Sequence, residues 1–94
     1  MNTFESAELL YENDKGQVLK KKIRIPQKRF NIGISKQREG YVNIGYFPLP
    51  LNTKKQGYTG LHGQYKEIHV TLPKSAVMGT ARLKIGKRIV SRAK

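Results

Sequence analysis

Hydrophobic and polar residues alternate with a period of two through most of this chain. The alternation is clearest in residues 41–47 and 65–72, and it returns in residues 17–25, 29–35 and 80–92. Successive side chains of a β-strand point to opposite faces, so the pattern predicts about five strands, each buried on one face. The predicted inward positions are Leu19, Ile23, Ile25, Phe30, Ile32, Ile34, Val42, Ile44, Tyr46, Ile68, Val70, Leu72, Leu83, Ile85 and Ile89.

Turns and breakers separate these strands. Residues 13–16 and 36–40 each end in a glycine, which adopts positive φ at little cost, so both predict hairpin turns. Pro73 and Gly79 are residue types that begin and end helices, and they predict one short helix over residues 73–79. Glycines at outward strand positions indicate the curvature that small barrels require.

Residues 1–13 leave two structures open. Phe4, Ala7 and Tyr11 recur at the spacing of one face of a helix, behind a threonine that is a candidate N-cap. Residues 6–12 are equally consistent with a strand that pairs with the strand after it. The sequence alone does not decide between the helix and the strand.

These elements together predict a mainly β fold. It would be a small curved antiparallel sheet or OB-like barrel of about five strands, with a long basic hairpin and one short helix. The predicted organisation is an acidic N-terminal segment, residues 1–14, and a single basic β domain, residues 15–94. A core of this size gives modest stability, which leaves a homodimer open.

Charge adds the strongest indication of a partner. The chain has 19 Lys and Arg residues against 6 Asp and Glu residues, for a net charge of +13. Residues 1–14 hold four of the acids and no base, so residues 15–94 carry +17. Self-repulsion at this level destabilises a small domain, and binding to nucleic acid relieves it. The acidic segment is either a solvated edge or an internal nucleic-acid mimic that shields the basic residues.

Several classes of site are excluded by composition. The chain has no cysteine, which excludes disulfides and thiolate metal sites and fits the cytoplasm, or the host cytoplasm if the chain is viral. Its two histidines and few carboxylates lack metal-ligand spacing, and no phosphate-binding glycine motif occurs, so we expect no metal and no other cofactor. No apolar run approaches the ~20 residues that cross a bilayer, and no signal-peptide pattern is present, so we expect no membrane partner.

Basic and aromatic residues share the outward positions of the predicted strands. We expect these side chains to form one exposed face, on which cations neutralise phosphates and rings stack on bases. The outward residues are Lys20, Lys22, Arg24, Arg29, Tyr41, Phe47, Tyr65, His69, Arg82, Lys84 and Arg88. The long hairpin, residues 52–63, adds Lys54, Lys55 and Tyr58.

The layout of curved strands, a basic hairpin, a short helix and a final strand resembles the small single-stranded-DNA-binding proteins of phages and plasmids. The resemblance covers most of the chain as an order of elements. It implies an OB-like barrel and a non-sequence-specific role in replication or recombination. Exposed rings also favour single-stranded DNA over duplex DNA, whose base faces are hidden.

Three other functions stay open. A structural or ribosomal RNA-binding protein fits the size and charge, and so does a viral inhibitor that binds an acidic host enzyme. A small ribonuclease would use histidine and glutamate for proton transfer and arginine for the developing phosphorane charge. The candidate residues for that reaction are Glu67, His69, His62, Tyr65 and Arg82. We expect a binding protein and no enzyme.

Overall fold

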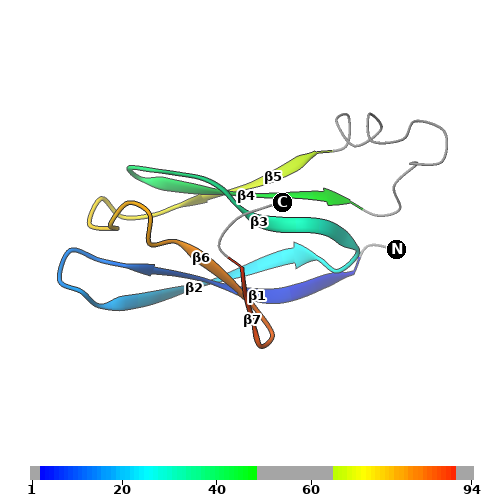
Figure 1. Cartoon of the computed structure of the whole chain (residues 1–94), viewed down its shortest axis with the longest axis horizontal. Helices are drawn as coiled ribbons and strands as arrows, with labels where there is room; N and C mark the ends of the chain where they lie inside the picture. The colour runs from blue at the N-terminus through cyan, green and yellow to red at the C-terminus, as the bar shows by residue number, and fades with distance from the viewer. Residues whose placement is uncertain (1–2, 49–64, 91–94) are drawn as a thin grey trace.

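Seven β-strands and no helix make up residues 3–48 and 65–90, which are the residues that the computed structural model describes (Figure 1). The strands are β1 (Phe4–Glu12), β2 (Val18–Pro26), β3 (Arg29–Arg38), β4 (Tyr41–Pro48), β5 (Lys66–Thr71), β6 (Arg82–Ile85) and β7 (Arg88–Val90). The prediction of a mainly β fold is confirmed. The long basic hairpin falls outside the described residues.

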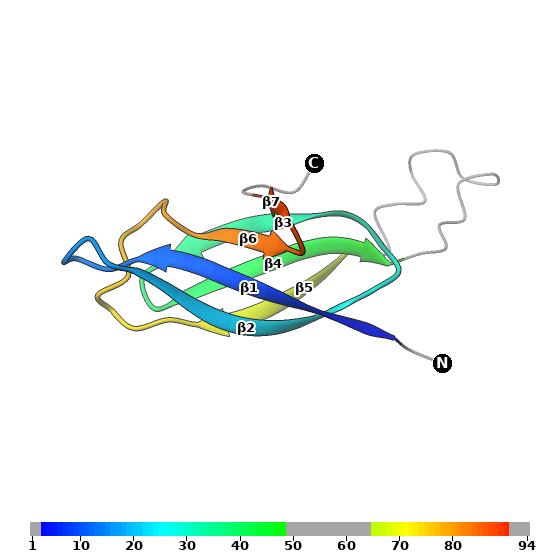
Figure 2. The ribbon, with the colours of Figure 1, turned by 90° about the horizontal axis from the view of Figure 1, so that it is seen from below.

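The strands form two antiparallel sheets. One has the order β2-β1-β6-β7 and the other has the order β3-β4-β5. The sheets lie face to face, and Figure 2 shows the layer of β1, β2 and β6 in front of the layer of β3, β4 and β5. The chain changes sheet twice, once between β2 and β3 and once between β5 and β6.

One hydrophobic core fills the space between the two sheets. The largest fully buried side chains come from both layers, and they are Leu9, Ile25, Val42, Ile44 and Leu83. Strand alternation places each of them on an inward face, as the apolar pattern predicts for all of them except Leu9. Burying apolar surface of this kind contributes roughly 25 cal/mol per Å², which makes this layer contact the main source of stability.

The N-terminal segment is a strand, so the strand alternative is confirmed and the helix is wrong. β1 pairs with β2 along its whole length and with β6 around Leu9, which makes it a central strand. Asn13 and Gly16 close the predicted turn to β2, with a hydrogen bond from the Gly16 amide to the Asn13 carbonyl and a φ of 78° at Gly16. The charge boundary after residue 14 therefore falls in this turn, within one continuous sheet.

Two β-bulges in β3 change which side chains point outward. The first lies between Phe30 and Gly33, where Asn31 has a φ of 53°. Asparagine is one of the few residues other than glycine that tolerate this region. Because of this bulge, Phe30 lies opposite Phe47 on the outer face and is 39% exposed. Its predicted inward position is therefore wrong.

The second bulge lies between Ile34 and Lys36. It places Lys36 opposite Asn43 and Arg38 opposite Tyr41, so both cations lie on the outer face of this sheet. The predicted turn over residues 36–40 is shorter than expected. β3 continues to Arg38, and the turn has a positive-φ glycine at its end.

Residues 73–79 are not helical, and the predicted short helix is wrong. The segment contains turns and an isolated bridge from Ala76 to Asn13. The Val77 amide donates to the Glu12 carbonyl. In addition, the Gln37 side chain donates to the Val77 carbonyl and accepts from the amides of residues 79 and 81. These long-range bonds satisfy backbone groups that a helix would pair internally.

The predicted last strand, residues 80–92, is a hairpin in the part that the structure describes. β6 and β7 are joined at Gly86, which has a φ of 60°. The turn reverses the chain, so Ile89 lies opposite Lys84 on the outer face and is 53% exposed. Its predicted inward position is wrong. Arg88 lies opposite the buried Ile85, and so it is not on the face of Lys84 as predicted.

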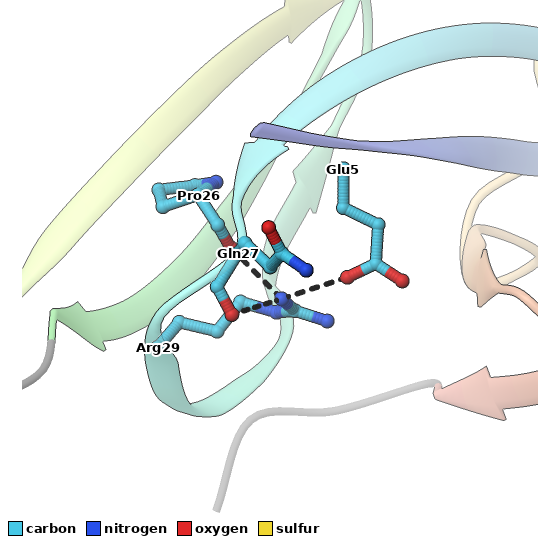
Figure 3. Close-up of polar contacts among 4 residues, drawn as sticks. All are labelled: Glu5, Pro26, Gln27 and Arg29. Carbon is cyan, nitrogen blue, oxygen red and sulfur yellow. Dashed lines mark hydrogen bonds and ion pairs between the residues drawn. The ribbon is translucent and has the colours of Figure 1, made fainter. Parts of the chain in front are cut away.

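Arg29 lies at the corner where β2 leads into β3, and its side chain bonds to the residues around it (Figure 3). Its guanidinium pairs with the Glu5 carboxylate at 3.0 Å and donates to the carbonyls of Pro26 and Gln27 at 2.8 and 2.9 Å. The Arg29 side chain is only 12% exposed, so its predicted outward position is wrong. This cation connects the two sheets at their common corner.

We predict that Arg29→Ala lowers the free energy of unfolding by about 1–3 kcal/mol, because two carbonyls and the Glu5 carboxylate lose their donor. Urea unfolding measures the change. Lys28→Ala removes the same charge from an exposed neighbour and is the matched control, with an expected change below about 0.5 kcal/mol. Equal losses in the two variants would contradict the structural role of Arg29.

Candidate nucleic-acid interface

The predicted basic and aromatic residues fall on two opposite faces of the molecule. The two sheets pack through their apolar sides, so their outer sides point away from each other. Lys20, Lys22 and Arg24 lie on the outer side of β2, and Arg82 and Lys84 lie on the outer side of β6. Tyr41, Phe47, Tyr65 and His69 lie on the outer side of β4 and β5. The prediction that cations and rings share one face is therefore wrong.

The five cations on the first sheet form what we call the basic face. The strand register sets Lys22 and Lys84 on either side of Glu8, and Lys20 and Arg82 on either side of Leu10. The two columns of cations flank β1 and are about 10 Å apart, which is two strand spacings. Within the described ranges the single ion pair is the one at the Arg29 corner, so no carboxylate pairs directly with these cations there.

Two residues of the basic face are partly engaged by their neighbours. The Arg24 guanidinium lies 4.6 Å from the ring centroid of Phe4, in a cation–π contact. The Arg82 guanidinium donates to the Thr80 carbonyl at 3.1 Å. The lysines of this face are exposed, and they are the groups best placed to meet phosphates.

The rings on the second sheet form two clusters at the two ends of what we call the aromatic face. Tyr41 and His69 are stacked, with ring centroids 4.8 Å apart and an interplanar angle of 28°. Phe47 and Tyr65 are 5.3 Å apart and tilted by 59°. Phe30 lies opposite Phe47 and extends the second cluster. Tyr41 and Phe47 are six residues apart along β4, which separates their Cα atoms by about 20 Å, while His69 and Tyr65 lie between them.

A polar network joins the two ring clusters, and the Glu67 carboxylate is its centre. The Ser35 hydroxyl donates to Glu67 Oε2 at 2.7 Å, and the Tyr65 hydroxyl donates to the same oxygen at 3.3 Å. The Asn43 side-chain amide donates to Oε1 at 3.4 Å. Donors from β3, from β4 and from the residue before β5 thus hold one carboxylate between the clusters.

The same network decides the tautomer of His69. The Asn43 amide nitrogen faces the carboxylate, which only accepts, so the Asn43 Oδ1 atom faces His69 Nδ1 at 2.9 Å. Since Oδ1 is an acceptor, His69 carries a proton on Nδ1. The Asn43 contact and the stack with Tyr41 together orient the His69 ring.

Gly45 makes room for Tyr65. A Cβ atom built on Gly45 would collide with the hydroxyl and ring carbons of Tyr65, so the tyrosine ring lies across the bare backbone of β4. From this position its hydroxyl reaches Glu67 and its ring contacts Phe47. The outward glycine, interpreted from sequence as a source of curvature, accommodates a side chain.

Sequence reasoning misses part of the aromatic face. Strict alternation assigns Phe30 to the core and leaves Lys36 and Arg38 in a turn, because it ignores bulges. An asparagine within a strand pattern is the available signal, since asparagine tolerates positive φ. Of the other predicted residues, Lys54, Lys55 and Tyr58 lie outside the described residues.

The residues of the ribonuclease hypothesis are only partly brought together. Glu67, Tyr65 and His69 share the aromatic face through Asn43, whereas Arg82 lies on the basic face. His62 lies outside the described residues. In the described part of the chain, no group of three or more histidine or acidic side chains could hold a metal ion. Residues 3–48 and 65–90 also contain no helix long and apolar enough to cross a membrane.

Comparisons with protein-family models, curated proteins and solved structures find no match to this chain. The function must therefore be argued from the two faces and their chemistry.

We predict that Gly45→Ala expels the Tyr65 ring into solvent, because a methyl group and the phenol cannot occupy the same space. NMR contacts between the Phe47 and Tyr65 rings measure the effect and should disappear. The cost in stability should be about 1 kcal/mol, from one ring contact and one long hydrogen bond. In a Tyr65→Ala background the same glycine change should cost nothing, and an equal cost in both backgrounds would contradict the collision.

Proposed function

We propose that this chain binds single-stranded nucleic acid, with single-stranded DNA favoured, by stacking bases on its aromatic face. The observation that carries the proposal is the pair of ring clusters on one outer sheet face, each with one exposed and one half-buried ring, in a protein with a net charge of +13. Burial of large rings in a core stabilises a protein, yet Tyr65 and Phe30 are both about 40% exposed. Rings placed in this way give a base a flat apolar partner.

Stacking on the rings requires the flat faces of bases, and this requirement favours single-stranded over duplex nucleic acid. Bases in a duplex are stacked on each other, and only their edges reach the grooves. Bases of a single strand expose their flat faces, and stacking on an aromatic side chain stabilises a complex by about 1–3 kcal/mol per base. No described element is a helix that would enter a major groove. We favour DNA over RNA because the order of elements resembles that of the single-stranded-DNA-binding proteins of phages and plasmids.

The phosphates have two sets of partners. Lys36 and Arg38 lie on the aromatic face itself, opposite Asn43 and Tyr41, and are exposed. A strand stacked on Tyr41 therefore passes within reach of two cations. The basic face on the far side adds to the attractive potential of the whole protein and contacts longer strands that pass around an edge of the molecule.

Fluorescence anisotropy with three labelled ligands tests the proposal at physiological salt. The ligands are an unpaired oligonucleotide of mixed sequence, a DNA duplex of the same length, and a folded RNA hairpin. We expect the oligonucleotide to bind most tightly. A clear preference for the hairpin would favour the structural RNA-binding alternative, and binding to none of the three would overturn the proposal.

We predict that Tyr41→Ala and Phe47→Ala each weaken binding to the oligonucleotide by about 1–3 kcal/mol, because each removes a stacking surface. Anisotropy titrations measure the change, and thermal unfolding verifies that the variants stay folded. Phe4→Ala is the matched control, since Phe4 is an exposed ring on the opposite face. A loss in the control as large as in the two variants would contradict stacking on the aromatic face.

The salt dependence of binding distinguishes the two sets of cations. We predict that Lys36→Ala with Arg38→Ala lowers the slope of log K against log salt by about 0.7 for each phosphate that is no longer neutralised. A short oligonucleotide is used, so that it covers one face. Lys22→Ala with Lys84→Ala removes the same charge from the basic face and should leave this slope nearly unchanged. The opposite result would place the short strand on the basic face.

A further inference from the structure

We propose that Glu67 gives the aromatic face a base preference, for guanine above all and against thymine and uracil. The inference rests on the proposed function and deepens it, because it names the bases that the face selects. It comes from the position of one carboxylate between two stacking clusters and from the hydrogen bonds that hold it there.

Glu67 lies where the edge of a stacked base would point. In the strand register it is opposite Gly45, which is opposite Gly33, so Glu67 is the only residue of this row with a side chain, and the Tyr65 ring covers Gly45. The stack of Tyr41 and His69 lies on one side of the row, and the pair of Phe47 and Tyr65 lies on the other. Because Glu67 is exposed between the two clusters, a base stacked on the outer side of either cluster has the carboxylate beside its edge.

The carboxylate retains one acceptor site toward a ligand. Each carboxylate oxygen has about two lone-pair sites, and an ionised carboxylate cannot donate. Oε2 accepts from Ser35 and Tyr65, whereas Oε1 accepts only the long bond from Asn43 within the described residues. The Ser35 bond, at 2.7 Å, is the short one and fixes the orientation of the group. Glu67 is exposed, so a base reaches Oε1 from solvent.

An acceptor of this kind distinguishes the four bases by their Watson–Crick edges, which single strands expose to proteins. Guanine has two adjacent donors, its imino N1–H and its amino group, and the second donor can replace the long Tyr65 bond at Oε2. Adenine and cytosine have one amino group beside an acceptor. Thymine and uracil have one imino donor between two carbonyl oxygens, which the carboxylate repels.

The negative charge also orients the strand. A phosphate near Glu67 is repelled, whereas Lys36 and Arg38 attract phosphates at the Tyr41 end of the same face. A bound strand therefore turns its bases, and not its backbone, toward the centre of the face. Orientation of this kind is what edge recognition requires.

Four labelled oligonucleotides of one length test the inference, each with thymine throughout except for a central G, A, C or T. A single guanine avoids the self-association of guanine runs. We expect the G oligonucleotide to bind about 5- to 10-fold more tightly than the T oligonucleotide, with A and C between them. That ratio corresponds to about 1–1.4 kcal/mol, which is modest for a charged hydrogen bond because the site is exposed.

Glu67→Gln keeps the size and the Ser35 contact but removes the charge, and it should reduce the G-to-T ratio to below about twofold. Glu39→Gln removes the same charge from the exposed turn between β3 and β4 and should leave the ratio unchanged. Equal binding of the G and T oligonucleotides by the wild-type protein overturns the base preference and leaves the proposed function standing. A ratio that survives Glu67→Gln overturns the role of Glu67. If none of the four binds, the proposed function itself fails.

Discussion

The structure depends on one constraint, which is that two small sheets must bury their apolar sides against each other. Neither sheet has a second core to pack on, and a chain of 94 residues has little apolar surface to spare. Leu9 and Leu83 from one sheet and Val42 and Ile44 from the other have no exposed surface. Once these sides are inward, every other side chain of the strands must lie on one of two faces that point in opposite directions.

That constraint separates the two kinds of group that a nucleic acid recognises. The five cations of the basic face and the rings of the aromatic face are about one sandwich thickness apart, and side chains of the core fill the space between them. The second bulge in β3 partly offsets the separation, because it brings Lys36 and Arg38 to the aromatic face. The charge beside the rings therefore depends on local backbone geometry and not on the overall composition.

Alternation in the sequence is enough to predict most of the fold, since every predicted inward residue except Phe30 and Ile89 lies in the core or packs against it. It fails where the period of two is interrupted, at the bulges before Gly33 and Lys36 and at the turn that places Ile89 outward. Alternation also does not predict which strands belong to which sheet. Each strand has an inward and an outward side in either sheet, so no local pattern says which outward sides face the same way.

The sequence predicts most of the rings that form the candidate site, but it does not predict the contacts between them. Tyr41, Phe47, Tyr65 and His69 are all on one outer face, as their outward positions suggest. The network around Glu67 needs three strands in register, and it includes a side chain from the bulged strand. The space that Gly45 leaves for Tyr65 exists only once β5 lies beside β4. Contacts of this kind depend on pairing between strands, which alternation within one strand does not encode.

The acidic N-terminal segment has a different role from that of a detachable shield. β1 is a central strand, and Ala7, Leu9 and Tyr11 are buried in the core. Its displacement by a nucleic acid would expose these side chains, at a cost of roughly 1.5–3 kcal/mol for each large one, and would separate β2 from β6. Glu8 instead acts in place, as a fixed negative charge in the row between Lys22 and Lys84. It lowers the potential of the basic face permanently. The same strand that completes the core thus limits how strongly that face attracts phosphate.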